Sequence, residues 1–347
     1  MKAGAESAPL LAALERLGAQ VRELRVPLDL ADAEPARRLR REIADQLDDY
    51  MLPRLRRLDA PLLAVVGGPT GAGKSTLVNS LVGAKVSAAG VLRPTTRSAV
   101  LAHHPADAGW FGERNILPGL ERSTDSSSDP ASLQLVRSEH IPAGLALLDA
   151  PDIDSVVSAN RELATQLLAA ADMWIFVTTA ARYADAVPWD FLRASVTRGT
   201  AVAVVLDRVP EGATDEVRAD LATMLTEQGL GGAPLFVVPE TTPYDAMLPA
   251  EVVEPLHGWL HGLATDATVR ANVVRHTLDG AVRSLAGRVF RLAASADAQA
   301  DGLARLRRDV DDAYDDALIR STPPVVTAPC CAGRCWPAGR SSSAPAS

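Results

Sequence analysis

The segment from Gly68 to Ser75, Gly-Pro-Thr-Gly-Ala-Gly-Lys-Ser, fits the phosphate-loop pattern G-x-x-x-x-G-K-[ST] in full. An apolar run from Pro61 to Val66 precedes it and indicates a buried strand, while Thr76 to Val82 has the apolar spacing of a helix. In such a strand–loop–helix unit, backbone N–H groups surround a phosphate and the new helix directs its positive end at the same anion. The segment therefore predicts a binding site for a nucleoside triphosphate.

Two side chains of the loop have predicted tasks of their own. Lys74 supplies a positive charge for the β- and γ-phosphate oxygens, and Ser75 supplies a hydroxyl to Mg²⁺. The predicted nucleotide-binding residues of this segment are Gly68, Pro69, Thr70, Gly71, Ala72, Gly73, Lys74, Ser75 and Thr76.

Length and composition are ordinary for a globular protein of about two domains. The chain has 347 residues, of which 47% are hydrophobic and 22% are charged. A net charge of -8 argues against a surface for nucleic acid over the whole molecule, so no nucleic-acid partner is expected. No apolar run approaches the roughly 20 residues of a membrane span, and the first residues lack a signal-peptide pattern. We therefore expect a cytoplasmic protein.

Strand-length apolar runs alternate with helical patterns after the loop. The runs lie at Ala99–His103, Leu145–Leu148, Met173–Val177, Ala201–Leu206 and Leu235–Val238, and the helical patterns at Asn160–Ala171, Trp189–Val196 and Asp215–Gln228. The alternation predicts an α/β fold of the P-loop NTPase type, a three-layer α/β/α domain with a mostly parallel sheet. The polar segment from Pro105 to Ser132 is predicted to be a mobile insertion.

Amphipathic helical patterns flank this domain on both sides, from Pro9 to Arg25, from Pro35 to Pro53 and from Val269 to Leu318. We expect these segments to form a flanking helical bundle from both chain ends; the alternatives are helices that cover the nucleotide domain and a surface helix packed on the sheet. The predicted domains are 1–58 (N-terminal helices), 59–262 (nucleotide domain), 263–320 (a long helix or stalk) and 321–347 (a disordered tail).

The tail changes character at Ser321 and becomes rich in Pro, Ser, Ala and Gly without periodicity. It holds all 3 cysteines, Cys330, Cys331 and Cys335, and an odd number without a neighbouring His predicts neither a disulfide framework nor a zinc site. Because the helical pattern stops abruptly, we hypothesise that the tail is out of frame and that the protein is C-terminally truncated. Resequencing the gene tests this hypothesis.

A carboxylate and a hydroxyl outside the loop complete the predicted Mg²⁺ site. Asp149 ends a buried apolar run, which is where the acid that orients a metal-bound water is expected. Thr96 lies in the loop Ala89–Arg97 and is predicted to close over Mg²⁺ when a γ-phosphate is present, with Thr95 as second choice. The predicted metal site is therefore Ser75, Thr96 and Asp149. An ordinary turn or capping role is the alternative for each residue outside the loop.

The turn after this acid predicts a switch. Asp149, Pro151 and Asp152 begin a segment expected to sense the γ-phosphate, because nucleotide orders such loops and hydrolysis releases them.

The order of these motifs resembles that of bacterial dynamin-like and Era-type P-loop GTPases, a translation-factor-related class. The resemblance covers about Leu62 to Val238 and rests on the phosphate loop, the Pro-Thr-Thr-Arg loop, the Asp-Ala-Pro-Asp turn and the strand Ala-Asp-Met-Trp-Ile-Phe-Val. It implies a G domain that binds and hydrolyses GTP with Mg²⁺, nucleotide-linked movement of the helices, and self-association through them. A peripheral membrane surface or a protein partner stays open.

The guanine-reading motif of that class, Asn-Lys-x-Asp, departs most from the pattern here. Its place is taken by Asp207, Arg208, Val209 and Pro210. Arg208 can cover the base as the family lysine does, so Asp207 and Arg208 are the predicted residues at the base. Pro210 supplies no carboxylate for the guanine edge, which leaves the choice of base open.

Two further departures concern hydrolysis. The family turn ends in glycine, whereas Asp152 adds a negative charge near the γ-phosphate. Dynamins carry water-positioning side chains inside the loop, and Thr70 stands at one of these positions. Lys74, Thr96 and Thr70 are the candidate catalytic residues implied by the resemblance, and slow intrinsic turnover is expected.

Two other classes of function stay open. A transporter- or motor-like ATPase shares the loop pattern, but the transporter signature Leu-Ser-Gly-Gly-Gln is missing, and its nearest match, Gly229–Ala233, lacks the serine. The second alternative is a nucleotide-binding scaffold with little hydrolysis.

Overall fold

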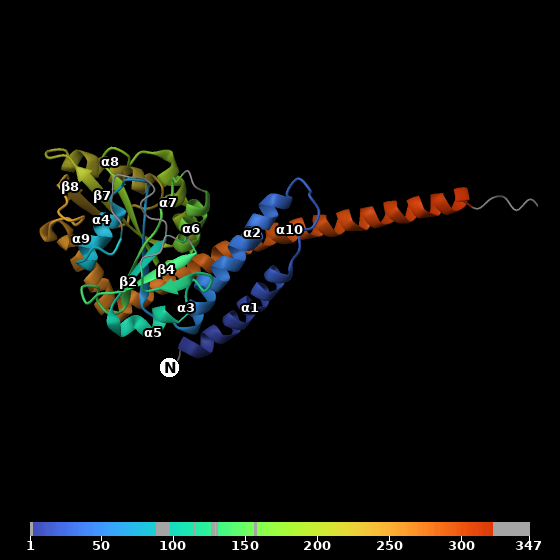
Figure 1. Cartoon of the computed structure of the whole chain (residues 1–347), viewed down its shortest axis with the longest axis horizontal. Helices are drawn as coiled ribbons and strands as arrows, with labels where there is room; N and C mark the ends of the chain where they lie inside the picture. The colour runs from blue at the N-terminus through green and yellow to red at the C-terminus, as the bar shows by residue number, and fades with distance from the viewer. Residues whose placement is uncertain are drawn as a thin grey trace, which may run out of the picture. The chain divides into compact units, whose positions relative to one another are not determined.

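The apolar run before the phosphate loop forms strand β1, Leu62–Gly67, inside an eight-stranded sheet (Figure 1). This computed structural model describes residues 3–87, 98–113, 115–125, 129, 131–155 and 158–321. The other strands are β2 Ala99–His103, β3 Glu121–Ser123, β4 Ser132–Arg137, β5 Leu145–Asp149, β6 Met173–Thr179, β7 Ala201–Val209 and β8 Leu235–Pro239. Their spatial order is β3-β4-β2-β5-β1-β6-β7-β8. β2 is antiparallel to β5 and the other neighbours are parallel, which confirms the predicted, mostly parallel sheet.

Helices cover both faces of the sheet, as the three-layer α/β/α prediction requires. One face shares a buried apolar cluster with α5 Ala108–Gly112, α6 Ser158–Ala169, α7 Ala186–Arg198 and α8 Thr214–Glu227. The other face shares a cluster with α4 Lys74–Val82, α9 Ala250–Thr265 and the first turns of α10 Ala267–Ser321. The predicted fold class is therefore confirmed.

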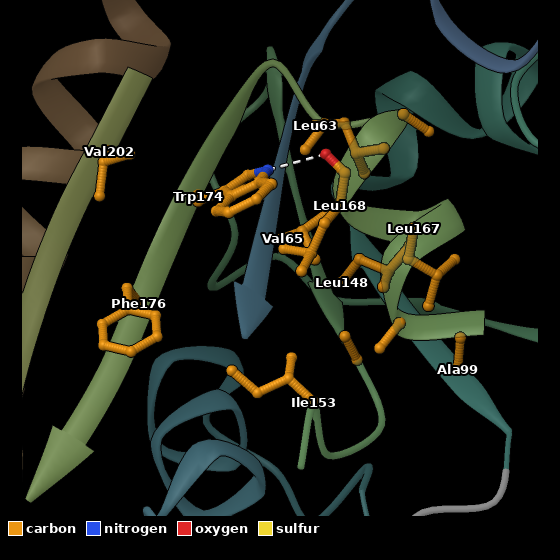
Figure 2. Close-up of a cluster of buried hydrophobic side chains, with 14 of the residues drawn as sticks. Leu63, Val65, Ala99, Leu148, Ile153, Leu167, Leu168, Trp174, Phe176 and Val202 are labelled. Atoms are coloured by element: carbon orange, nitrogen blue, oxygen red, sulfur yellow. Dashed lines mark hydrogen bonds between the residues drawn. The ribbon is translucent and has the colours of Figure 1, made fainter. Parts of the chain in front are cut away.

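Side chains of β1 alternate between the two faces, although the strand reads as one apolar run. Leu63 and Val65 belong to the cluster beneath α6, α7 and α8, whereas Ala64 and Val66 belong to the opposite one. The indole of Trp174 in β6 joins the first cluster, and its Nε1–H donates to the carbonyl of Leu168 in α6 at 2.7 Å (Figure 2). The ring is thus buried with its single donor satisfied.

Helices from both chain ends pack together, as predicted. The N-terminal part comprises α1 Ala3–Glu23, α2 Ala33–Gln46, the π-helical turn η1 Leu47–Met51 and α3 Leu52–Arg56. Its buried side chains share a third apolar cluster with α10, whose members include Leu14, Ile43, Leu47, Met51, Leu278, Leu285 and Leu292. The flanking helical bundle is therefore confirmed for the part of α10 that precedes Ala298.

A buried ion pair ties this bundle to the amino end of the sheet. Arg54 of α3 pairs with Asp172, which directly precedes β6, and their side chains are 2% and 0% exposed. The same carboxylate accepts the backbone N–H of Leu63 at 2.7 Å. The hydroxyl of Thr277 in α10 donates to the carbonyl of Asp172 at 2.8 Å. Helices from both chain ends therefore meet the sheet at one residue.

The prediction of a mobile insertion from Pro105 to Ser132 is wrong for the described residues. They form the 3-10 turn η2 Pro105–Asp107, helix α5 and strand β3, and their buried side chains include Phe111, Ile116, Leu117 and Leu120. Strand β4, also missing from the prediction, pairs with β2. The apolar residues are spaced irregularly among Ser, Asp and Gly, so neither a helical nor a strand period reveals them.

The chain divides into two units, residues 1–297 and 298–347. In the second unit α10 continues to Ser321 and exposes Leu306, Val310 and Leu318. The predicted tail beyond Ser321, with its cysteines, lies outside the described residues, and the predicted domain boundaries stay predictions. Each helix in the described ranges is too short or too polar to cross a lipid bilayer.

Candidate nucleotide-binding site

The phosphate loop joins β1 to α4, and two of its glycines are required by close contacts. A Cβ atom at Gly68, where φ is +154°, would lie 2.1 Å from the carbonyl oxygen of Val177. A Cβ atom at Gly73, where φ is +92°, would lie 2.3 Å from Oδ2 of Asp207. Both positions combine a backbone conformation that disfavours side chains with a lack of space. The loop therefore keeps its backbone close to β6 and β7.

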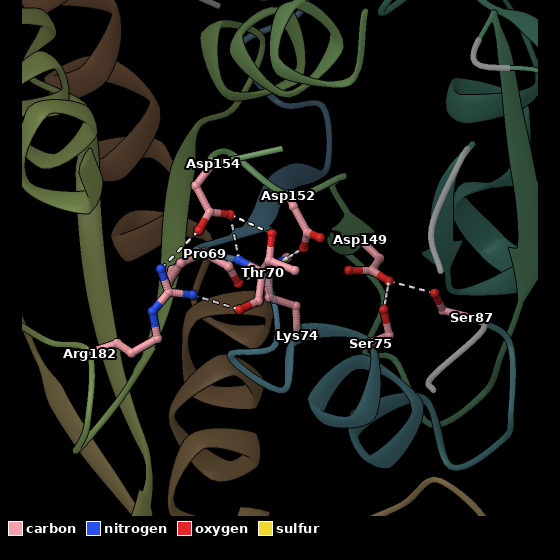
Figure 3. Close-up of polar contacts among 9 residues, drawn as sticks. All are labelled: Pro69, Thr70, Lys74, Ser75, Ser87, Asp149, Asp152, Asp154 and Arg182. Carbon is pink, nitrogen blue, oxygen red and sulfur yellow. Dashed lines mark hydrogen bonds and ion pairs between the residues drawn. The ribbon is translucent and has the colours of Figure 1, made fainter. Parts of the chain in front are cut away.

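Lys74 is the first residue of α4 and is buried. Its ammonium donates to the carbonyl of Pro69 at 3.0 Å and to Oδ1 of Asp152 at 2.6 Å (Figure 3). The lysine thus lies back over the loop, in the position from which it can reach the phosphates of a nucleotide. Asp152, predicted to lie near the γ-phosphate, is its partner in this structure.

Asp149, at the end of β5, lies beside the start of α4. Its Oδ2 accepts the hydroxyl of Ser75 at 2.7 Å and the hydroxyl of Ser87, a contact that the sequence did not predict. Asn79 places Ser87, because its Oδ1 accepts the backbone N–H groups of Val86 and Ser87, each at 2.9 Å. Burial raises the pKa of Asp149, while the hydrogen bonds from both serines and the charge of Lys74 lower it.

These residues fit a Mg²⁺ ion. Within the described part of the chain, Oδ1 of Asp149 is a buried oxygen without a hydrogen-bond partner. Among the same residues, no group of 3 or more His, Cys, Asp or Glu side chains is arranged to hold a metal ion. Mg²⁺ commonly binds through one or two carboxylates together with substrate phosphates. Oδ1 of Asp149, beside Ser75, can supply such a carboxylate oxygen.

The loop after β5 brings a further acid to the phosphate loop. Oδ1 of Asp154 accepts both the backbone N–H of Thr70, at 2.6 Å, and the Thr70 hydroxyl. Arg182, from the loop after β6, donates to the carbonyl of Thr70 at 2.8 Å and to Oδ2 of Asp154 at 3.0 Å (Figure 3). Burial alone would raise the pKa of Asp154, but the hydrogen bonds from Thr70 and Arg182 lower it. Thr70 is therefore held from both sides.

Sequence reasoning missed Asp154 and Arg182. Asp154 lies only two positions beyond Asp152, so the cluster of acids after β5 was a usable signal. Arg182 carried no such signal, since nothing local in the sequence relates it to a loop that lies 112 residues earlier.

Asp207 and Arg208 lie at the carboxyl end of β7, on the other side of β1 from β5. Oδ1 of Asp207 accepts the backbone N–H of Arg208 at 2.9 Å, and burial raises the pKa of Asp207. Arg208 is half-exposed and has a φ of +54°, in the left-handed region. Oδ2 of Asp207 thus lies beside Gly73, and Nε of Arg208 lies 3.8 Å from the same oxygen.

The structure therefore brings the predicted loop residues Gly68 to Thr76 together with Asp149, Pro151, Asp152, Asp207 and Arg208 at the carboxyl edge of the sheet. Thr95 and Thr96 lie in 88–97, outside the described residues, so their predicted Mg²⁺ contact stays a prediction. Ligands of open α/β sheets bind in the crevice outside this edge.

No protein-family model matches the sequence, and no curated protein matches it. Among solved structures, the chain is similar to a member of an oligomerised bacterial dynamin pair described for long range sensing and tethering of membranes. The two are 13% identical over 92% of this chain and 50% of that chain, with a TM-score of 0.45, so this chain spans about half the length of the dynamin.

Two further structures are similar to the chain. Era from Aquifex aeolicus, bound to GDP and AlF4⁻, is 19% identical over 57% of this chain and 56% of that chain, with a TM-score of 0.38. Toc33 from Arabidopsis thaliana, in complex with Mg²⁺ and GMPPNP, is 12% identical over 67% of this chain and 93% of that chain, with a TM-score of 0.36. Bacterial dynamin-like and Era proteins, the classes that the motifs resemble, are thus among the structures to which this chain is similar. The assignment to the P-loop class rests on the protein's own strand order and phosphate loop.

Proposed function

We propose that this chain is a switch protein that binds GTP with Mg²⁺ and hydrolyses it slowly. The proposal rests on the proximity of Lys74, Ser75 and Asp149 at the carboxyl ends of β1 and β5. Of the described atoms around it, none hydrogen-bonds Oδ1 of Asp149, which leaves that oxygen for an ion-bound water. P-loop proteins hold a Mg²⁺-triphosphate with this set of groups.

Each group has a proposed task. Lys74 neutralises the β- and γ-phosphate oxygens, and the backbone N–H groups of the loop surround the β-phosphate. Ser75 and Asp149 would hold Mg²⁺, which would supply positive charge to the phosphate oxygens. Thr70, fixed by Asp154, is the candidate for positioning the attacking water. Turnover is expected to be slow because Asp152, the partner of Lys74, adds a negative charge near the expected γ-phosphate.

The proposed movement of the helices has a physical route through α6. The loop that carries Asp152 and Asp154 leads into this helix. Near its other end, the Gln166 amide donates to Oδ2 of Asp49 at 2.8 Å, in the π-helical turn of the N-terminal helices. A loop that shifts with the nucleotide would therefore pull on the bundle through α6. The hydrogen bond between Gln166 and Asp49 supports this proposal.

The preference for guanine over adenine is tested by titrating the protein with labelled GTP, GDP and ATP, with and without Mg²⁺. Because Asp207 and Arg208 take the place of the guanine-reading motif and are proposed to lie at the base, GTP is expected to bind at least about tenfold more tightly than ATP, a difference of about 1.4 kcal/mol. Pro210 favours a second candidate, an ATPase of the P-loop class, because it gives the guanine edge no carboxylate acceptor. Tighter binding of ATP than of GTP would establish that candidate in place of the first.

Thr96 is tested separately, since its role rests on the sequence. Thr96→Ala is expected to spare diphosphate binding and to weaken only the Mg²⁺-triphosphate complex. Equal losses for both nucleotides would contradict a switch role.

Self-association through the helices and a peripheral membrane surface are also part of the proposal. Leu306, Val310 and Leu318 are each at least half exposed on the last turns of α10, which supports a contact surface there. Gel filtration with GTP, GDP, ATP and no nucleotide tests self-association, and flotation with anionic vesicles tests membrane binding. An oligomer that forms equally in all conditions would indicate a scaffold rather than a switch.

A further inference from the structure

The partner of Lys74 is a carboxylate at the place where a terminal phosphate is expected. The lysine side chain is 5% exposed, and a buried ammonium needs a compensating anion. Oδ1 of Asp152 supplies that anion at 2.6 Å. The side chain of Asp152 is 23% exposed, so water reaches this carboxylate but scarcely reaches the lysine.

The strand order places Asp152 at the terminal end of a bound row of phosphates. β1, which carries the phosphate loop, lies between β5 and β6, with β7 beyond β6. Asp207 of β7 lies beside Gly73 and is the residue proposed above for the base end, whereas Asp152 follows β5. A nucleotide with its base near Asp207 therefore extends its phosphates towards Asp152. The γ-phosphate and the Asp152 carboxylate then compete for the same ammonium.

The loop that carries Asp152 is anchored on both sides of this residue. Asp149 is held by Ser75, and Asp154 is held by Thr70 and Arg182. The backbone N–H of Ile153 also reaches the carbonyl of Gly68, at 3.4 Å. A triphosphate therefore has to displace a carboxylate that the surrounding contacts keep in place.

We propose that Asp152 is a specificity-determining residue that makes this site favour a nucleoside diphosphate over the corresponding triphosphate. The inference rests on the proposed function, since it requires a nucleotide on the phosphate loop. A diphosphate leaves the terminal position empty, so the ion pair between Lys74 and Asp152 can persist beside it. A triphosphate brings a second anion, its γ-phosphate, to the same ammonium. The γ-phosphate and the Asp152 carboxylate would then repel each other strongly, because the site is partly buried.

The test compares affinities for Mg²⁺-GTP and GDP, and for the corresponding adenine nucleotides, in the wild-type protein and in Asp152→Asn. The asparagine keeps the size of the side chain and removes its charge. Asp152→Gly is the second variant, and circular dichroism verifies that both fold. Asp59→Asn is the matched control, because it removes the same charge from an exposed carboxylate that precedes β1, at the opposite edge of the sheet.

The expected result is a gain in triphosphate affinity of at least about tenfold in Asp152→Asn, with less than about a threefold change for the diphosphate, and no change in Asp59→Asn. Equal changes for both nucleotides, or none, would overturn the inference while the proposed function stands. Failure of the wild-type protein and both Asp152 variants to bind any nucleotide would overturn the proposed function and the inference together. Binding that appears only in the Asp152 variants would contradict both, because the wild-type protein would then bind neither the triphosphate nor the diphosphate.

Discussion

Two ion pairs between an aspartate and a basic side chain mark opposite ends of the central strands, and they differ in how completely they are sealed. At the amino end, Arg54 and Asp172 are 2% and 0% exposed. At the carboxyl end, Lys74 and Asp152 are 5% and 23% exposed. The first pair is closed off from water on both sides, whereas the second is open on the side of its acid.

Their other partners differ in the same sense. The guanidinium of Arg54 also donates to the carbonyls of Ala60 and Pro61, at 3.1 and 2.7 Å, and Asp172 also accepts from Leu63. Lys74 has one further acceptor, the carbonyl of Pro69 in its own loop. The Arg54 guanidinium, with several fixed acceptors, is suited to a structural ion pair. The flexible Lys74 ammonium, whose anion can be exchanged for a phosphate, is suited to a ligand site. The two pairs therefore differ in burial and in the number of their partners, and these differences distinguish a structural ion pair from one at a ligand site.

The largest predicted effect breaks the sealed pair. Arg54→Ala leaves the Asp172 carboxylate buried without its cation, so the free energy of unfolding should fall by about 3 to 5 kcal/mol. Urea unfolding measures it. Arg56→Ala, in the same helix but paired with Glu15 at the surface, should change stability by less than about 1 kcal/mol. Equal losses of stability in the two variants would show that the buried ion pair of Arg54 and Asp172 does not stabilise the fold.

The second prediction concerns Asp49, in the π-helical turn just before α3. Burial, above all, raises its pKa from 3.8 to about 7. The folded state then binds more protons than the unfolded state between these values, so stability should fall as the pH rises from about 4 to about 7. At about 1.4 kcal/mol per pH unit, the upper bound is on the order of 4 kcal/mol.

Asp49→Asn should remove this slope, since an amide does not ionise in the range. Urea unfolding between pH 4 and pH 8 measures it. Asp59→Asn is the control, because the Asp59 carboxylate is exposed and pairs with Arg57, and it should keep the slope. A slope that survives in Asp49→Asn would assign the pH dependence to other groups.

The third prediction moves to the open end of the sheet. Asp149→Asn removes the carboxylate proposed to hold the Mg²⁺-bound water, so the gain in GTP affinity that Mg²⁺ brings, expected to be about tenfold, should disappear. Calorimetric titration with and without Mg²⁺ measures it. Asp190→Asn, on an exposed face of α7, should retain the full Mg²⁺ effect. A normal Mg²⁺ effect in Asp149→Asn would remove this residue from the metal site.

The smallest predicted effect concerns the support of Thr70. Asp154→Asn replaces hydrogen bonds from this threonine to a charged acceptor, about 1.5 to 3 kcal/mol each, by hydrogen bonds to a neutral one, about 0.5 to 1.5 kcal/mol each. GTP turnover should therefore fall by about threefold, with little change in affinity, as measured by phosphate release. Asp185→Asn touches Arg182 but not Thr70 and serves as its control. A larger fall in the control would assign the effect to Arg182 instead.

Local patterns in the sequence were sufficient for the part of the site that is continuous along the backbone. The run into β1, the glycines and Lys74 predicted the strand, the loop and the helix that the structure contains. Asp149 was found because it follows a strand-length apolar run, and the carboxyl ends of parallel strands share one edge. Period and spacing were enough for these elements.

The rest depended on contacts between residues that lie far apart in the sequence. Arg54 and Asp172 are 118 residues apart, and no local period relates them. The hydrogen bond between Asp152 and Lys74 spans 78 residues, and it exists only because β5 and β1 are neighbours. The prediction of a mobile insertion from Pro105 to Ser132 failed for another reason. Its polar composition gives no periodic apolar pattern, although Phe111 and Leu117 are buried in the core as single residues.

The phosphate loop at the carboxyl end of β1 is proposed to bind GTP through Lys74. Nucleotide affinity with and without this lysine tests the proposal directly. Calorimetric titration of Mg²⁺-GTP into the wild-type protein and into Lys74→Ala compares the two affinities under the same conditions. The account predicts saturable binding of one nucleotide by the wild-type protein and a loss of at least about a hundredfold in the variant, since a buried phosphate array loses its main compensating charge. Unchanged affinity in Lys74→Ala would contradict it.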